Sequence, residues 1–165
     1  MNHNKLILEM TKYYAGDPAR IQHFMKVYGY SKMIGELEGL DAETRMILET
    51  AAIVHDIGIK KSEEIYGDSS GKHQEELGPD IAKVVLENLG YDSVLIQRVS
   101  YLVGNHHTYG NIDGMDYQIL VEADFLVNLY EDHSPENAIE NALNKIFKTE
   151  SGKQILRTMF GLPML

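Results

Sequence analysis

The chain has 165 residues and contains no cysteine. This absence excludes disulfide scaffolds, thiolate metal sites and cysteine nucleophiles. No apolar run approaches the roughly 20 residues that a membrane-spanning helix needs. The first residues, MNHNKLILEMTKYY, also lack the cationic start, long apolar stretch and small-residue cleavage site of a signal peptide. We therefore expect a cytoplasmic protein.

Positive charge is scarce in this sequence. There are 15 lysines and arginines against 25 acidic residues, which gives a formal net charge of −10. Such a balance disfavours binding to long nucleic acids through a basic surface and disfavours anionic membranes. It leaves room for a small phosphorylated substrate, because one cationic patch or a metal ion can hold a phosphate. Association into a homo-oligomer is left open.

Hydrophobic residues make up 44% of the chain, which is typical of a soluble globular protein. Apolar residues recur at helical spacing, and no window alternates with a period of two. The polar, glycine-punctuated stretch 60–72 is predicted to be a loop. We expect an all-α fold with one domain over residues 1–165, a core at about 18–130 and C-terminal helices at 134–165 packed on it. The helices are expected at about 3–14, 18–38, 42–57, 74–89, 93–105, 117–130, 136–148 and within 151–165, with Asp17, Asp41, Asp92 and Asp116 as N-caps for four of them.

Several polar residues lie in apolar surroundings. His55 and Asp56 follow the run ETAAIV, Asp124 lies within ILVEADFLVNL, and His23 lies among apolar residues in the middle of a helix. Glu122, in the same stretch as Asp124, is free to face solvent on this pattern. A buried carboxylate is costly unless its charge is compensated. One divalent cation would compensate several of these groups together, because imidazole and carboxylate ligands suit Mn²⁺, Fe²⁺, Ni²⁺ or Zn²⁺.

Each of these residues also has a structural interpretation. A single core histidine is more often hydrogen-bonded than a ligand, and a lone aspartate in an apolar helix is more often paired with arginine or used as a cap. A His-Asp dipeptide also occurs by chance. The combination favours a metal site, because the His-Asp pair ends an apolar helix, a histidine precedes it and an aspartate lies in a later apolar helix.

With these residues the sequence resembles the HD-domain superfamily of metal-dependent phosphohydrolases. The resemblance covers about residues 20–129 through the segments RIQHFMKV, ETAAIVHDIGIKK, GNHHTY and QILVEADFLVNL. It implies a helical bundle of the HD-domain type in which His23, His55, Asp56 and Asp124 bind a divalent metal ion. The identity of the ion is open among Mn, Fe, Ni, Zn, Co and Mg.

Some branches of this superfamily bind a second metal through two further histidines. In this chain the first of these positions falls on Gln74, one residue out of register with His73. The second corresponds to His106 or His107, and the sequence does not choose between them. The resemblance therefore favours one ion over two, with His73, His106 and His107 as candidate contacts to a second metal or to substrate.

The activity implied by the resemblance is hydrolysis of a small phosphate ester, such as a nucleotide or another phosphorylated metabolite. Asp56 would hold the attacking water or take its proton, while Arg20, Lys60, His106 and His107 would neutralise charge on the phosphate. The alternative interpretation of Arg20 is a surface ion pair, and the alternative interpretation of Lys60 is a solvated charge in a loop. Two alternative functions remain open. One is a nucleotide- or metabolite-binding HD module without turnover, and the other is a two-iron, oxygenase-like HD protein.

Overall fold

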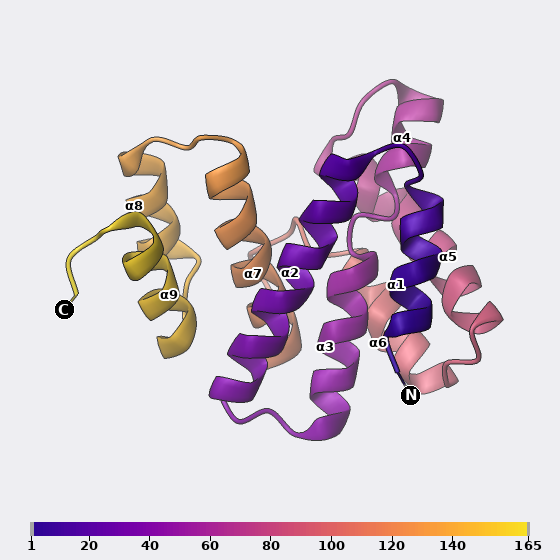
Figure 1. Cartoon of the computed structure of the whole chain (residues 1–165), viewed down its shortest axis with the longest axis horizontal. Helices are drawn as coiled ribbons and strands as arrows, with labels where there is room; N and C mark the ends of the chain where they lie inside the picture. The colour runs from indigo at the N-terminus through magenta and orange to yellow at the C-terminus, as the bar shows by residue number, and fades with distance from the viewer. Residues whose placement is uncertain (1, 165) are drawn as a thin grey trace.

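The computed structural model describes residues 2–164, and within that range the chain forms nine helices and no strand. The all-α prediction is therefore confirmed (Figure 1). The helices are α1 (Asn4–Tyr13), α2 (Pro18–Leu37), α3 (Ala42–Val54), α4 (Ile59–Tyr66), α5 (Gly71–Asn88), α6 (Ser93–Val103), α7 (Met115–Glu131), α8 (Glu136–Lys145) and α9 (Glu150–Phe160).

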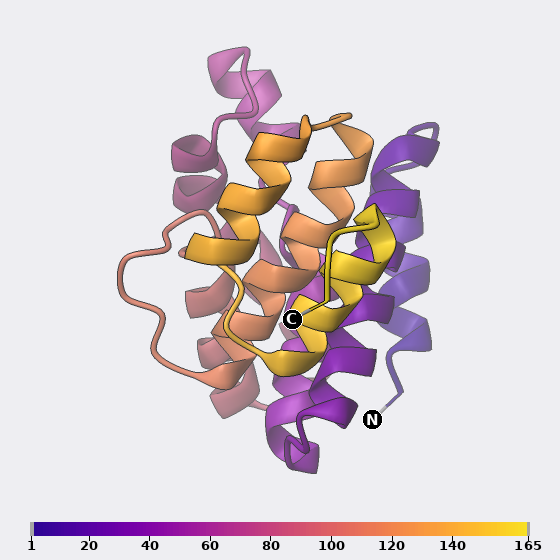
Figure 2. The same cartoon turned by 90° about the vertical axis from the view of Figure 1, so that its left-hand side faces the viewer.

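Three helices, α2, α3 and α7, contact one another and form the centre of the bundle. Helix α2 packs along both α3 and α7, α3 also contacts α6, and α6 pairs with α5 (Figure 1). Helix α9 contacts α7 and α2, and Figure 2 shows α8 and α9 lying in front of α7 at one end of the molecule. None of the helices in residues 2–164 combines the length and the apolar character needed to cross a membrane. The core is filled by apolar side chains from all three central helices, among them Val27, Ile34, Leu48, Ile53, Leu120 and Val127.

Three helices begin at the aspartates that the sequence indicates. The side chains of Asp17, Asp41 and Asp92 accept hydrogen bonds from backbone N–H groups three residues further along, at the starts of α2, α3 and α6. A cap of this kind satisfies one of the N–H groups that the first helical turn leaves free. The helix starts that position His23 and His55 are therefore encoded locally.

The predicted loop at 60–72 is wrong, because α4 occupies most of it. Lys61 and Glu64 form an ion pair one helical turn apart, and the helix ends at Gly67, whose φ of 73° is the left-handed conformation of a C-terminal cap. Helix α5 begins soon afterwards at Gly71, where Ser70 accepts a hydrogen bond from the backbone N–H of His73. Only the short connection 67–70 remains between α4 and α5.

Helix α7 also differs from the prediction at its start. Asp116 does not cap it, because the N-cap residue is Gly114 and Asp116 lies in the first turn. The Asp116 carboxylate accepts hydrogen bonds from Nε and Nη2 of Arg98, both at 2.8 Å. This pair joins α7 to α6 across the 104–114 connection.

The expectation that Glu122 faces solvent is wrong, since its side chain is fully buried. Its carboxylate accepts hydrogen bonds from the backbone N–H groups of Lys148 and Thr149, at 2.6 and 2.9 Å. Helix α8 accordingly ends at Lys145, three residues earlier than expected, and the chain turns inward to reach Glu122.

Candidate metal centre

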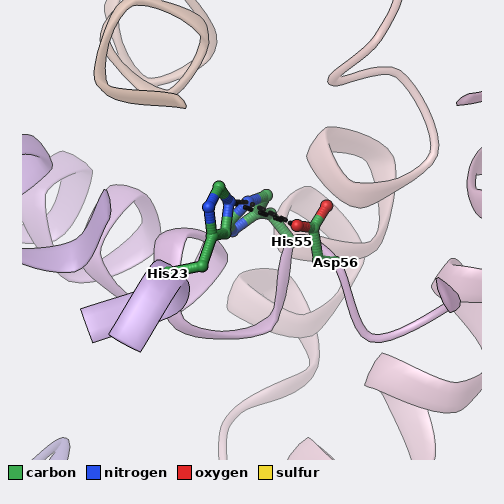
Figure 3. A group of neighbouring side chains, drawn as sticks. All are labelled: His23, His55 and Asp56. Atoms are coloured by element: carbon green, nitrogen blue, oxygen red, sulfur yellow. Dashed lines mark hydrogen bonds and ion pairs between the residues drawn. The ribbon is translucent and has the colours of Figure 1, made fainter. Parts of the chain in front are cut away.

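Four polar side chains from three helices meet inside the bundle. His23 comes from the middle of α2, His55 and Asp56 follow the last residue of α3, and Asp124 comes from the middle of α7. Figure 3 shows His23 and His55 directed toward each other and toward the carboxylate of Asp56. The side chains of His55 and Asp124 are almost completely buried, at 0% and 6% exposure. The structure therefore brings together the four residues that the sequence places at a metal.

The atoms that meet are two imidazole nitrogens and two carboxylate oxygens. Nε2 of His23 lies 3.2 Å from Nε2 of His55, 3.2 Å from Oδ2 of Asp56 and 3.1 Å from Oδ1 of Asp124. Nε2 of His55 lies 3.3 Å from each of the same two oxygens. Ligand atoms about 2.1 Å from a shared ion stand about 3.0 Å apart at 90° and about 3.4 Å apart at a tetrahedral angle. The observed spacings fall within that range.

The other ring nitrogens determine which way the lone pairs point. Nδ1 of His55 donates to the carbonyl oxygen of Ala52 at 2.7 Å, and Nδ1 of His23 donates to the Glu131 carboxylate at 2.6 Å. Both acceptors lack a proton to give, so Nδ1 carries the hydrogen and the neutral ring directs an Nε2 lone pair inward. Lone pairs and carboxylates then face one another. Such a centre requires positive charge, and the donor set fits a divalent metal ion.

A second group adjoins the first through Asp56. Oδ1 of Asp56 lies 3.3 Å from Nε2 of His106, and ligand atoms of Asp56, His106 and His107 lie within 4.8 Å of one another. Nδ1 of His106 donates to the carbonyl oxygen of Val103 at 2.8 Å, so its lone pair also points inward. The two carboxylate oxygens of Asp56 thus face different groups. The preference for one ion over two stays a prediction.

Gln74, and not its neighbour His73, faces this second group. Gln74 is buried, and its amide oxygen accepts a hydrogen bond from Nε2 of His107 at 2.9 Å. The His73 ring instead stacks on Tyr66 and lies with Nδ1 2.8 Å from Asp68. His73 therefore does not occupy the place that the sequence considered for it as a candidate ligand.

The electrostatics of the centre favour added positive charge. Burial alone would lower the pKa of His23, but its hydrogen bonds to Asp124 and Asp56 outweigh burial and raise that pKa to about 10. Burial is likewise outweighed at His55, where the two carboxylates raise the pKa. Burial would raise the pKa values of Asp56 and Asp124, but the charge of His55 holds both below their usual range. Protons and a metal ion therefore compete for this centre.

The turn that carries His55 and Asp56 is held by two tyrosines whose role the sequence did not indicate. The phenol of Tyr14 donates to the carbonyl oxygen of Asp56 at 2.7 Å, and that of Tyr13 donates to the next carbonyl at 3.0 Å. On the other side, a Cβ atom at Gly58 would lie 2.7 Å from the carbonyl oxygen of Gln74. Gly58 has an ordinary φ of −75°, so glycine is needed there for the close approach of α5.

The two cationic residues predicted to contact phosphate pair with other groups in this structure. The Arg20 guanidinium pairs with Glu63 and with Asp17, which is the surface ion pair considered as its alternative. Nζ of Lys60 donates to the carbonyl oxygen of Tyr13 at 3.2 Å and lies 5.2 Å from the centre of that ring. Neither side chain lines the pocket above the metal centre.

That pocket has a volume of about 430 Å³. Asp56, Gln74 and His107 connect it to the candidate metal centre. Burial lowers the pKa of His107, and the neighbouring His106 lowers it further, to about 4. The pocket gives a small molecule access to the carboxylate that both groups share. Its remaining lining residues are Ile59, Ser69, Tyr109, Phe125, Asn128 and Asp132.

Comparison with known proteins agrees with this geometry. The family model named HD domain matches residues 20–151, so this chain belongs to the HD domain family. Members of this family are generally metal-dependent hydrolases that bind divalent metals. The structure is similar to the crystal structure of a predicted HD superfamily hydrolase from an uncultured Thermotogales bacterium. The TM-score is 0.68 at 25% sequence identity, and the match covers 96% of this chain and 86% of that chain. No curated protein matches this sequence.

Proposed function

We propose that this chain is a metal-dependent phosphohydrolase that acts on a small phosphate ester, such as a nucleotide or another phosphorylated metabolite. The observation that carries this proposal is the set of inward Nε2 lone pairs and carboxylate oxygens, 3.1–3.3 Å apart, beneath an open pocket. Membership of the HD domain family supports hydrolysis, and the phosphate ester is our own inference.

The residues of the chain divide the work between binding and proton transfer. His23, His55, Asp56 and Asp124 would hold the ion. When bound, a divalent ion supplies Lewis acidity toward a phosphoryl oxygen and makes water a better nucleophile. Asp56 is the ligand that also lines the pocket, so its carboxylate is placed to orient the attacking water or to take its proton. His107 also lines the pocket, and its lowered pKa keeps it neutral, so it would offer a hydrogen bond and not a positive charge to the phosphate.

Metal analysis and a phosphatase screen on the same preparation test the proposal. We expect a divalent metal in the purified protein and metal-dependent release of phosphate from at least one small ester. Asp56→Ala should remove both metal and turnover while circular dichroism stays helical. Asp80→Ala is the matched control, because Asp80 is an exposed aspartate on α5 outside the pocket lining. Phosphatase activity that survives in Asp56→Ala would contradict the proposal.

The same experiment separates the other candidate functions. Bound metal together with a bound nucleotide that is never converted would indicate a binding module. Two irons per chain without phosphatase activity would indicate the oxygenase-like alternative. Phosphate release that does not require metal would overturn the role given to His23 and Asp124.

A further inference from the structure

The wall of the pocket carries no cationic side chain. Beyond the residues that adjoin the metal centre, the lining comprises three polar residues, Ser69, Asn128 and Asp132, and an apolar side, and no lysine or arginine contributes among the described residues. Asp132 brings a carboxylate. A phosphate held at the metal therefore meets no further positive charge in this wall.

The hydrogen-bonding groups of the wall include acceptors that favour a ligand with hydrogen-bond donors. The Asn128 amide donates one Nδ2–H to Asp124 at 3.0 Å, so its carbonyl oxygen remains as an acceptor and its second N–H as a donor. Both ends of the Gln74 amide are already bonded, to His107 and to the carbonyl oxygen of Ser69. The Asp132 carboxylate only accepts. Among the groups that remain for a ligand, the Asp132 carboxylate and the Asn128 carbonyl oxygen are acceptors that pair with hydroxyl or amine donors, whereas the Ser69 and Tyr109 hydroxyls both donate and accept.

The apolar side of the pocket suits a flat group. The rings of Tyr109 and Phe125 pack edge to face with centroids 5.3 Å apart, and Ile59 completes this side. Aromatic walls of this kind bind planar rings through offset or edge contacts. The outer part of the ligand therefore combines a planar apolar portion with hydrogen-bond donors.

We propose that the substrate is a phosphomonoester whose leaving group is uncharged or positive, carries hydroxyl or amine donors and includes a flat ring, and that Asp132 selects against further phosphates. This inference rests on the phosphohydrolase function proposed above. A second or third phosphate would bring negative charge close to the Asp132 carboxylate, in a wall that has no lysine or arginine, and like charges there are unfavourable. The preference for a monophosphate over a triphosphate therefore comes from repulsion by the Asp132 carboxylate and not from attraction at the metal.

The mono-, di- and triphosphates of one nucleoside are suitable probes, because they differ only in the number of phosphates. The divalent metal is kept in excess, since triphosphates chelate it. We expect kcat/KM for the monophosphate to exceed that for the triphosphate by about tenfold or more. Asp132→Lys should narrow this ratio. Glu43→Lys makes the same change of charge at an exposed residue in the first turn of α3, about 20 Å from the His55 end of that helix, and should leave the ratio unchanged.

A binding measurement supplies a readout that does not need turnover. Calorimetry with the unphosphorylated nucleoside should show binding that weakens in Asp132→Asn and persists in Glu43→Gln. Triphosphate turnover that equals or exceeds monophosphate turnover would overturn the inference, as would equal effects of the two lysine variants on the ratio. If no ester is hydrolysed, the phosphohydrolase proposal fails. The pocket inference is then decided by affinity, because tighter binding of the triphosphate than of the monophosphate would refute it.

Discussion

Two buried carboxylates lie two residues apart on α7, and their surroundings are opposite. Glu122 and Asp124 have residue exposures of 0% and 4%. The Glu122 carboxylate accepts from the Gln118 amide, from the backbone N–H groups of Lys148 and Thr149, and from the Thr149 hydroxyl. Every one of these partners is a donor, so the charge of Glu122 is satisfied by the protein itself.

Asp124 has one such donor, the Asn128 amide at 3.0 Å, and otherwise faces the Nε2 atoms of His23 and His55 at 3.1 and 3.3 Å. Those nitrogens are acceptors when the rings are neutral, because both Nδ1 atoms donate outward. A buried carboxylate surrounded by donors is a structural element, whereas one that faces lone pairs requires a proton or a metal ion. On the same helix, Glu122 is therefore a structural residue that connects α7 to the 146–149 segment, whereas Asp124 belongs to a binding site.

The largest expected effect is on metal binding in Asp124→Asn. The amide keeps the shape of the side chain but loses the charge and one ligand oxygen. We expect metal affinity to fall about 100-fold or more, beyond the range measured for residues behind the ligands, while the helical content is kept. Competition with a chromogenic chelator measures the affinity. An unchanged affinity would remove the distinction between Asp124 and Glu122.

The matched change at the other carboxylate, Glu122→Gln, should act on stability. One side of the new amide would present N–H to groups that are themselves donors, and a buried N–H left without an acceptor costs about 1–3 kcal/mol. We expect the free energy of unfolding to fall by about 2–3 kcal/mol, with metal affinity unchanged when measured well below the unfolding temperature. Urea unfolding and the chelator assay report the two quantities separately. Loss of metal binding in a folded Glu122→Gln protein would show that Glu122 also belongs to the centre.

The dependence of stability on pH should sharpen the same contrast. In the metal-free protein burial acts to lower the pKa of His23, but Asp124 and Asp56 raise it from 6.5 to about 10. A raised pKa in the folded state means that this contribution to stability is complete below pH 6.5 and is lost as the pH rises toward 10. A bound metal replaces the proton, so the difference in Tm between loaded and chelator-treated protein should widen over this interval. Parallel Tm curves would contradict this account, and Asp124→Asn should show a smaller widening.

The fold was largely predictable because its signals are local. Caps at Asp17, Asp41 and Asp92 and helical spacing of apolar residues placed most helices within a few residues. Helix α4 was missed because its residues are polar, so that glycine punctuation outweighed the ion pair of Lys61 with Glu64. The solvent-facing interpretation of Glu122 failed for another reason, since its two backbone N–H donors come from residues 26 and 27 positions later in the chain.

The candidate site was predictable only in part. The identities of His23, His55, Asp56 and Asp124 follow from the residues and the family resemblance, because buried charges in apolar helices require compensation. The phosphate-binding roles given to Arg20 and Lys60 depended on spacing and on the family resemblance, and in the structure Arg20 pairs with Glu63 while Lys60 donates to the carbonyl oxygen of Tyr13. The support of the His55–Asp56 turn by Tyr13 and Tyr14 is invisible in sequence, because it joins residues more than 40 positions apart.

The smallest of these effects should arise at a third carboxylate, which touches the centre only through a histidine. Glu131 accepts from Nδ1 of His23 at 2.6 Å and so fixes the ring with Nε2 toward Asp124. Glu131→Gln retains an acceptor but removes the charge, so metal affinity should fall about tenfold, as for other residues that orient metal ligands. Glu140→Gln, at an exposed residue of α8, is the control and should leave affinity unchanged. If Glu131→Gln lowered stability as Glu122→Gln does and left affinity intact, Glu131 would belong with the donor-satisfied carboxylates, and the orientation of His23 would have to be maintained by packing on α2 alone.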